Sequence, residues 1–333
     1  MQNQNKLLIL ICAILIASTL VGQVLLNVSP YNRTLNGDRD GDLALYDIDS
    51  NIYSDYAAMA FVSQQNYGIT DYVICYGDDR IWFASPEKID QSVLHLKRSL
   101  QRCSIQASVI GVEETLLLMQ DSIENNSFST AIIFVTGSLP NEIYDKENPL
   151  ILEWLSAGGV MYWGNGPIGK YVSTIGEDEL GEIHDYNLLF FGKEDVIRCD
   201  VRNVFDRDPP YEGLADVMRM LFNECTNGID NSLLENSIDF GFEHESFKSV
   251  TLTKYHDGTG MIVVFGGTLN VNNALYASQV IASGINYSSV MIDFERGEAK
   301  SVSGELELSG SGIYTLFIYT GGVQGIFAKA FAL

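Results

Sequence analysis

The chain has 333 residues, 46% of them hydrophobic and 11% aromatic, which is enough for a packed core and excludes an intrinsically disordered protein. Its 20 lysine and arginine residues against 43 aspartate and glutamate residues give a formal net charge of −23. A field of that sign repels phosphate backbones and anionic lipid headgroups, which excludes nucleic acid as a partner and suits a solvated surface outside the cell.

The first predicted element is the uncharged apolar segment of residues 7–26. A helix of that length rises about 30 Å, the hydrocarbon thickness of a bilayer. We therefore expect a single-pass transmembrane signal anchor in the cell membrane; a cleaved signal peptide, whose apolar core is usually about 7–15 residues long, is the alternative. Because Lys6 marks the inner side, residues 1–6 are expected to be a short cytoplasmic tail and the bulk of the chain to be extracytoplasmic.

Cysteines and glycosylation sequons fit this exterior location. Four cysteines follow the apolar segment, and outside the cell they can form two disulfides in any of three pairings, with buried thiols as the alternative. Proximity in the sequence favours the pairs Cys75–Cys103 and Cys199–Cys225. Asn-X-Ser/Thr sequons mark candidate glycosylation sites at Asn32, Asn125 and Asn286.

Strand-like runs alternate with helical patterns in the main part of the chain. Residues 27–41 are expected to be an acidic polar tether, after which 42–47 read as a strand, 55–66 as a helix and 71–77 as a second strand. A capping serine before Pro86 starts the next helix, whose apolar residues recur at spacings of three and four.

The later units repeat this alternation. A buried strand at 131–137 precedes a helix that opens at Pro149 and ends at a glycine pair before the strand "VMYWG". In the less regular middle part, 187–192 read as a strand, and the run "GMIVVFGGT" with the helix at 272–283 forms the last unit. The predicted fold class is α/β, with a mostly parallel sheet flanked by helices over residues 42–288. Period-two alternation then predicts a small C-terminal β appendage at 289–333.

Three glycine-punctuated stretches resemble one family. They are "IIFVTGSLPNEIYD", "LEWLSAGGVMYWGNGPIG" and "GTGMIVVFGGTLN". The chain is similar there to the class I glutamine amidotransferase-like superfamily, which has a flavodoxin-like α/β fold, and most of all to its non-catalytic branch with ThuA-like proteins and the trimerisation domain of certain β-galactosidases. The resemblance covers roughly residues 42–288.

The catalytic residues that this resemblance implies are missing. A working amidotransferase carries a cysteine on a strained strand-to-helix turn, and here the nearest position after "MYW" is Asn165, between Gly164 and Gly166. The His-x-Glu pair that would activate the cysteine is replaced by His244 followed by Ser246 two residues later. We therefore expect no amidotransferase activity and assign no catalytic residue.

Ligand-binding candidates follow the predicted strands, because ligands of open α/β sheets bind at the carboxyl ends of the strands. Backbone amides of the glycine-rich loops and nearby carboxylates are the relevant groups, with plain turns and solvated loop acids as the alternative reading. Ser138 also follows a buried strand, but it lacks a G-x-S-x-G signature and a partner histidine. The candidates are Asp47, Asp49, Asp78, Gly137, Ser138, Asn165, Gly166, Gly267 and Thr268.

The stretch "NGDRDGDLALYD" has oxygen ligands at the spacing of an EF-hand or dockerin calcium loop. An acidic tether is the alternative, because no helix precedes the stretch and Asp47 is shorter than the usual bidentate glutamate. The candidate calcium ligands are Asn36, Asp38, Asp40, Asp42 and Asp47.

The leading hypothesis is a membrane-anchored extracytoplasmic protein, non-catalytic and amidotransferase-like, that acts in ligand binding or assembly at the cell envelope. It would need no cofactor apart from the candidate calcium ion, and its partner would be an envelope protein or carbohydrate. The first alternative is an envelope carbohydrate-active hydrolase that uses strand-end carboxylates. The second is a structural accessory subunit of a membrane complex.

Overall fold

The computed structural model describes most of the chain from residue 33 onward. The described residues are 33–40, 43–51, 56–64, 69–77, 79–103, 105–147, 149–201, 226–234, 237–239, 243–244, 247–248, 250–283, 286–294, 299–308, 313–320 and 326–332. The predicted tail and signal anchor, residues 1–26, lie outside them. Within the described part of the chain, no helix has both the length and the apolar character needed to cross a bilayer.

A seven-stranded sheet forms the centre of the α/β domain, with the order β13-β16-β17-β8-β6-β4-β5. Five of its strands are parallel: β4 (Asp71–Cys75), β5 (Ala107–Ile110), β6 (Thr130–Phe134), β8 (Val160–Trp163) and β17 (Met261–Phe265). In chain order they lie as 2-1-3-4-5, one of the common doubly wound arrangements. Antiparallel β16 (Val250–Lys254) and β13 (Ile238–Asp239) complete one edge. The predicted mostly parallel sheet is confirmed.

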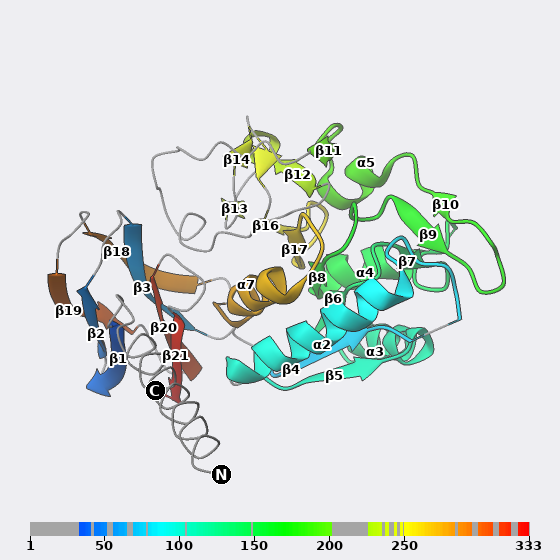
Figure 1. The fold of residues 1–333 in the computed structure, drawn as a ribbon. Coiled ribbons are helices and arrows are strands. Elements are labelled where there is room, and N and C mark those ends of the chain that lie inside the picture. Colours follow the sequence, from blue (N-terminus) through cyan, green and yellow to red (C-terminus); the bar gives the residue numbers. More distant parts are fainter. Residues whose placement is uncertain are drawn as a thin grey trace, which may run out of the picture.

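Helices cover both faces of this sheet, as Figure 1 shows. They are α2 (Pro86–Arg102), α3 (Val112–Glu124), α4 (Leu150–Ala157) and α7 (Val271–Ser283). α2 packs against α7, and α3 packs against α4. The inner strands are buried along their length, which explains why they read as continuous apolar runs rather than as alternating ones. The aromatic residues of the core include Phe134, Trp154, Tyr162, Trp163 and Phe265.

The short strand β7 (Leu139–Pro140) follows β6, and further short elements occupy the chain between β8 and β17. They are β9 (Tyr171–Ser173), β10 (Gly181–Glu182), α5 (Tyr186–Phe191), β11 (Ile197–Val201), β12 (Thr226–Asp230), η1 (Asn231–Leu233), β14 (Glu243–His244) and β15 (Phe247–Lys248). β7 pairs in parallel with β9, while β11, β12, β15 and β14 form a separate four-stranded sheet. The strand predicted at 187–192 is wrong: it is helix α5, which ends at Gly192 in the left-handed conformation.

A second, all-β domain is built from both ends of the described chain. Its strands are β1 (Arg33–Asp40), β2 (Leu43–Asn51), β3 (Tyr56–Gln64), β18 (Asn286–Phe294), β19 (Ala299–Glu307), β20 (Ile313–Thr320) and β21 (Ile326–Ala332). They form two antiparallel sheets, β1-β2-β19 and β18-β3-β20-β21. This β domain lies on the left in Figure 1, with the α/β domain on the right.

The α/β domain is therefore an insertion between β3 and β18. Gln64, the last residue of β3, is the direct partner of Asn286, the first residue of β18. The domain boundaries expected from the sequence differ from this arrangement, because residues 33–64 belong with the C-terminal strands and not with the parallel sheet. The helix predicted at 55–66 is wrong: its uniformly apolar sequence "AAMAFV" has no period that separates a helix from a strand, and β3 lies between β18 and β20.

Candidate functional site

The loops after the parallel strands meet at the carboxyl edge of the sheet, on the side away from the β domain (Figure 1). β4 and β6 are neighbours, but the chain continues from β4 to β5 on one side and from β6 to β8 on the other. Such a switch point is where open α/β sheets bind ligands. The predicted candidates that the structure brings to this edge are Gly137, Ser138, Asn165, Gly166, Gly267 and Thr268.

Asn165, at the elbow after β8, is fully used in hydrogen bonds. It is 6% exposed and has φ +68°, a conformation that asparagine tolerates better than most residues. Its Nδ2 donates to the carbonyl oxygen of Val135 at 2.7 Å and to Ser92 Oγ at 3.0 Å. Its Oδ1 accepts the backbone N–H of Leu269 at 2.7 Å. The side chain thus ties α2, the end of β6 and the loop after β17 together.

The residues after β17 take part in the same framework. The Asn165 N–H donates to the carbonyl oxygen of Gly267 at 3.4 Å. The Asn273 Nδ2 on α7 donates to the carbonyl oxygen of Thr268 at 2.7 Å. These two predicted ligand residues therefore have a structural use in joining the sheet edge to α7.

Gly137 and Gly166 are glycine because two loops and an aromatic ring approach closely there. A Cβ on Gly137 would lie 2.6 Å from the carbonyl oxygen of Asn165 and 2.9 Å from Phe83 Cδ1. A Cβ on Gly166 would lie 2.7 Å from the same Phe83 atom. Phe83 is 46% exposed and stacks on Tyr171 with ring centroids 4.9 Å apart. The two glycines thus seat an aromatic ring that covers the edge.

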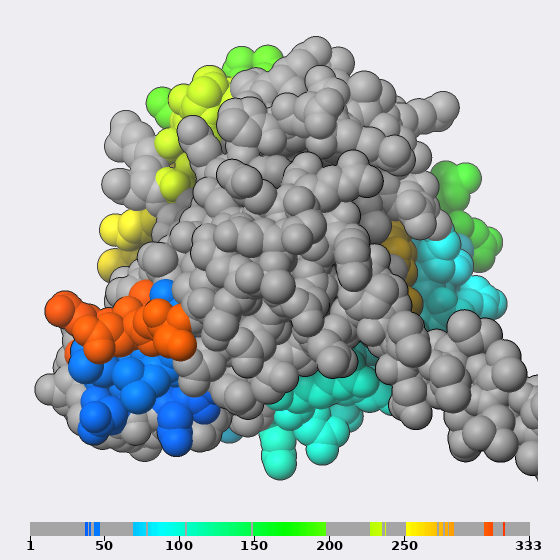
Figure 2. Space-filling model, turned by 60° about the vertical axis from the view of Figure 1, so that its left-hand side comes forward, coloured from blue at the N-terminus to red at the C-terminus, as the bar shows by residue number. Residues whose placement is uncertain are grey.

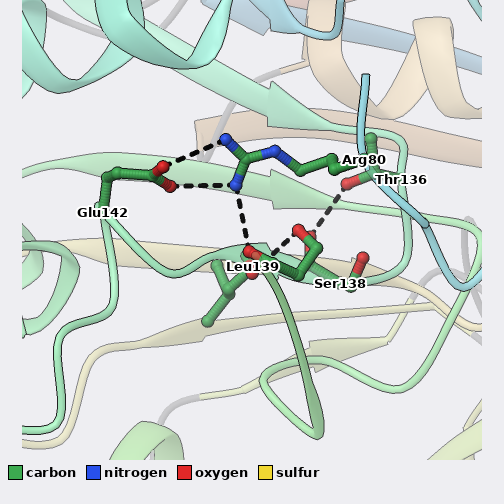
Figure 3. A network of polar contacts seen from close by, with 6 residues as sticks. Arg80, Thr136, Ser138, Leu139 and Glu142 are labelled. Atoms are coloured by element: carbon green, nitrogen blue, oxygen red, sulfur yellow. Dashed lines mark hydrogen bonds and ion pairs between the residues drawn. The ribbon is translucent and has the colours of Figure 1, made fainter. Parts of the chain in front are cut away.

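Ser138 is buried and its Oγ has no hydrogen-bond partner among the described residues. Its carbonyl oxygen accepts a hydrogen bond from Thr136 Oγ1 at 2.9 Å, which holds the loop (Figure 3). His244, which the sequence resemblance aligns with a catalytic histidine, lies on β14 in the separate four-stranded sheet. Because no described base contacts the hydroxyl, the geometry provides no activated nucleophile at Ser138.

Arg80 and Glu142 form a paired fork beside this loop, as Figure 3 shows. Arg80 Nη1 lies 2.9 Å from Glu142 Oε2, and Arg80 Nη2 lies 3.2 Å from Oε1. Nη1 also donates to the carbonyl oxygen of Ser173 at 3.0 Å, so the fork holds β9 against the β4 loop. The Arg80 side chain is 1% exposed and that of Glu142 39%.

The environment keeps Glu142 ionised. Burial raises the pKa of its carboxyl group, but hydrogen bonds from Arg80 and from the backbone, with the Arg80 charge, outweigh burial and leave the pKa below its ordinary value. A carboxyl group of this kind is unsuited to act as a general acid. The sequence motifs did not indicate this pair or Ser92; the signals present in the sequence were a lone arginine between a strand and a helix, and a polar residue on the apolar stripe of α2.

The predicted carboxylates are not at this edge. Asp47 and Asp49 lie on β2, where Asp47 pairs with Asn36 and Ser303, and Asp49 pairs with Thr34 and Ser301. Asp78 lies outside the described residues. The expectation that Asp47 and Asp49 follow the first strand of the parallel sheet is therefore wrong, because that run belongs to the β domain.

The predicted calcium stretch forms the β1–β2 hairpin, in which Asp40 pairs with Leu43 and Asn36 with Asp47. An EF-hand loop wraps its ligands around one ion, whereas extended strands hold successive same-face residues apart along the strand. No group of three or more potential metal ligands occurs among the described residues. Asp42 lies outside the described residues. The hairpin register thus contradicts an EF-hand conformation for this stretch.

The hairpin instead divides its residues between two faces of the β1-β2-β19 sheet. Ala44, Tyr46 and Leu306 are buried on one face. The opposite face carries exposed acidic residues of β1 and β19, and Figure 2 shows the β1–β2 hairpin, in blue, beside β19, in orange, on the surface. The exposed acids are Asp38, Asp40, Glu305 and Glu307.

Cys75 and Cys103 are buried thiols, so the predicted disulfide between them is wrong. Cys75 is the last residue of β4, which lies next to the edge strand β5, while Cys103 directly follows α2 and has its Sγ 3.9 Å from Ser278 Oγ on α7. Burial raises the pKa of Cys103 to about 11, which keeps the thiol protonated. The side chain of Cys199 and all of Cys225 lie outside the described part.

The sequons lie at different places. Asn125 is exposed at the C-terminal end of α3, where its Nδ2 donates to Asp121 Oδ1 at 2.7 Å. Asn286 opens strand β18, and Asn32 is outside the described residues.

A comparison with protein-family models finds no match, and no curated protein matches the chain. The fold and the edge geometry are therefore the basis for any functional statement.

Proposed function

We propose that this chain is a membrane-anchored, extracytoplasmic and non-catalytic protein, in which an amidotransferase-like α/β domain serves ligand binding or assembly at the cell envelope. The anchor is residues 7–26, and the partner is an envelope protein or carbohydrate. The doubly wound strand order and the glycine elbow after β8 agree with the family resemblance.

The observation that carries the proposal is the hydrogen bonding of Asn165 at the elbow after β8. All the hydrogen-bonding groups of the Asn165 side chain are used by Ser92, Val135 and Leu269. An amide is no nucleophile, and this one fixes three elements of the fold. The elbow thus acts as a structural clasp at the position where related folds carry out chemistry.

The hydrolase alternative receives less support. It needs two carboxyl groups about 5–9 Å apart, one of them able to donate a proton. Asp47 and Asp49 belong to another sheet, and Glu142 is held ionised by Arg80. Binding or assembly therefore remains the function that the geometry favours.

The test combines location and turnover on the full chain. Membranes that contain the protein are extracted with alkaline carbonate, and intact cells are treated with protease from outside. The detergent-purified chain is then incubated with glutamine and with a panel of glycosides. We expect retention in the membrane, cleavage from outside and no turnover. Turnover that disappears in the Ser138→Ala variant, or release of the chain by carbonate, contradicts the proposal.

A further inference from the structure

Exposed apolar side chains gather at the carboxyl edge of the parallel sheet. Exposed and buried residues alternate along residues 79–85, and the large apolar side chains of Ile81 and Phe83 are on the exposed side. Ile81 is 43% and Phe83 46% exposed, whereas the charged residue Arg80 is only 8% exposed. This arrangement is the reverse of the usual one at a protein surface, where charged side chains are the ones that face water.

A second segment extends this apolar surface. Tyr171, the first residue of β9, stacks on Phe83 with ring centroids 4.9 Å apart and an angle of 13° between the ring planes. Ile175 is 56% exposed and comes shortly after Ser173, whose carbonyl oxygen accepts a hydrogen bond from Arg80 Nη1 at 3.0 Å. The two segments thus lie against each other. We call the surface that they form the edge patch; it consists of Ile81, Phe83, Tyr171 and Ile175.

The ring of Phe83 is held in place without being buried. Its Cδ1 would lie 2.9 Å from a Cβ on Gly137 and 2.7 Å from a Cβ on Gly166, so both positions require glycine. Tyr171 stacks on the ring and is itself covered by Lys170, whose Nζ lies 5.1 Å from the Tyr171 ring centroid. A ring that its neighbours already fix loses little conformational freedom when a partner covers it. Ordered, exposed aromatic residues of this kind are typical of the dominant contacts in protein interfaces.

Carboxylates surround the edge patch. Asp79 lies on the exposed side of the same segment as Ile81, and Glu182 is the direct cross-strand partner of Tyr171 in the β9–β10 pair. The turn that joins β9 to β10 adds further exposed acids, which are Glu177, Asp178 and Glu179. These five acids form an acidic rim beside the apolar residues.

The basic residues of the two segments leave this rim negative. Residues 79–85 and 170–182 contain one basic residue each, Arg80 and Lys170. The Arg80 side chain is 1% exposed and is bonded to Glu142, and Lys170 is half-buried with its Nζ over the neighbouring tyrosine ring. The exposed charge next to the edge patch is therefore mostly negative.

We infer that the edge patch docks on a protein partner that presents an apolar or aromatic anchor flanked by lysine or arginine residues. This inference rests on the proposed function in binding or assembly and names the class of partner. Opposite charges at the rim accelerate the encounter and select the partner, while the apolar contact supplies most of the affinity. The β domain, to which the proposed anchor connects, lies on the other side of the molecule (Figure 1).

Other occupants fit the edge patch less well. A second copy of this chain would use the same surface on both molecules, and a two-fold contact of that kind would bring two acidic rims together. An anionic lipid surface is repelled by the same rim. A carbohydrate would stack on the ring of Phe83, but Ile81 and Ile175 lack the flat face on which sugar rings stack.

The experiment selects peptides from a phage-displayed random library on the detergent-purified full chain, after depletion of the library on the Phe83→Ser variant. The depletion step removes peptides that bind elsewhere on this acidic chain. We expect the remaining peptides to share an aromatic or aliphatic anchor flanked by lysine or arginine. Synthetic copies, measured by fluorescence anisotropy, should lose affinity for the unmutated chain as NaCl rises to about 0.5 M.

Variants that are not used in the depletion decide whether these peptides cover the edge patch. Ile81→Ser with Ile175→Ser should weaken peptide binding at least about tenfold, because the apolar contact is removed. Asp79→Lys with Glu182→Lys should weaken it at least about threefold, because the rim then repels a basic peptide. If Phe83→Ser does not fold, Ile175→Ser replaces it in the depletion step.

Matched controls lie on other surfaces. Leu94→Ser on α2 removes an apolar side chain with the same 46% exposure as Phe83. Glu124→Lys with Asp257→Lys reverses two exposed acids that precede β6 and β17 at the opposite edge of the sheet. Both controls should bind the peptides as the unmutated chain does. An absence of peptides after depletion, peptides without basic residues, or equal losses in the controls overturns the inference.

The other occupants and the proposed function have outcomes of their own. A dimer in analytical ultracentrifugation that dissociates in Phe83→Ser, or binding to a glycan array that this variant loses, overturns the inference in favour of a second copy or a carbohydrate. Release of the chain from membranes by carbonate, or substrate turnover, contradicts the proposed function whatever the peptides do. If the chain is retained and inactive but peptide binding does not depend on the edge patch, only the docking inference fails.

Discussion

At the scale of single residues, the Asn165 side chain joins three parts of the fold through one amide group. Its partners Ser92, Val135 and Leu269 are separated from it along the chain by as many as 104 residues. Local patterns identify turns, whereas contacts between loops follow from the packed sheet.

Replacing Asn165 should therefore lower stability. Asn165→Gly keeps the positive φ but loses three hydrogen bonds, at about 1 kcal/mol each, so we expect a loss of about 2–4 kcal/mol in the free energy of unfolding. Asn165→Ala should cost about 1 kcal/mol more, because alanine is disfavoured at that φ. Urea denaturation measures both variants. A stability equal to that of the unmutated protein would contradict the role of a clasp.

Ser138→Ala serves as the contrasting variant at the same edge. The buried Oγ has no described partner, so its removal abolishes an uncompensated polar group. We expect unchanged stability or a gain of up to about 1 kcal/mol. A loss of more than about 1 kcal/mol would show that the hydroxyl has a stabilising contact.

Glu142 gives a pH-dependent prediction. Its folded pKa lies below the ordinary value of 4.5, so its contribution to stability is present above that value and is lost as the pH falls through the folded pKa. Glu142→Gln should reduce stability by about 1 kcal/mol at pH 7, a small figure because the side chain is partly exposed. The difference between the two proteins should vanish in acid; denaturation midpoints across this range provide the measurement, and a constant difference would contradict it.

At the scale of elements, the β1–β2 hairpin explains both a success and a failure of sequence interpretation. Alternating polar and apolar residues in residues 36–47 are typical of a strand with one buried face. The same acids also fit the spacing of a calcium loop and the composition of a tether, because the partner strand β19 lies more than 250 residues further along the chain. No local pattern contains that pairing, so the β domain could not be derived from the sequence.

A substitution at Gly304 on β19 tests which face of the β1-β2-β19 sheet is buried. It faces Tyr46 across the strands, and a Cβ there would overlap the phenol ring. We expect Gly304→Val to reduce stability by about 1–3 kcal/mol through overpacking. Ser303→Val, on the exposed face of the same strand, should change it by no more than about 0.5 kcal/mol. Chemical denaturation of both variants checks the assignment of faces, and equal effects would refute it.

At the scale of the whole molecule, the helix-flanked parallel sheet was predictable because each of its units is local. Its buried strands are continuous apolar runs, and α2 begins at Pro86 as its capping pattern indicates. The edge positions Gly137, Asn165 and Gly166 were also correctly placed at strand ends. The sequence did not indicate that the strands of residues 33–64 pair with those of residues 286–332 to form the β domain.

The net charge of −23 should make stability depend on salt. Repulsion among carboxylates, including the exposed acids of the β1-β2-β19 face, opposes compaction and is screened by ions. We expect the urea midpoint to rise between about 0.02 M and about 0.5 M NaCl. Replacing Asp38, Asp40, Glu305 and Glu307 by their amides should make that rise smaller. A midpoint that is insensitive to salt would contradict this account.

The pairing of Gln64 with Asn286 determines how mechanical load would travel through the molecule. Paired residues in antiparallel strands lie about 5 Å apart, so the inserted unit leaves and rejoins its host at nearly one point. A pull applied through Arg33 and Ala332 would stretch only the strands of the β domain and would bypass everything inserted between them. The carboxyl edge of the parallel sheet thus lies outside the path of tension along the backbone and is not deformed by it.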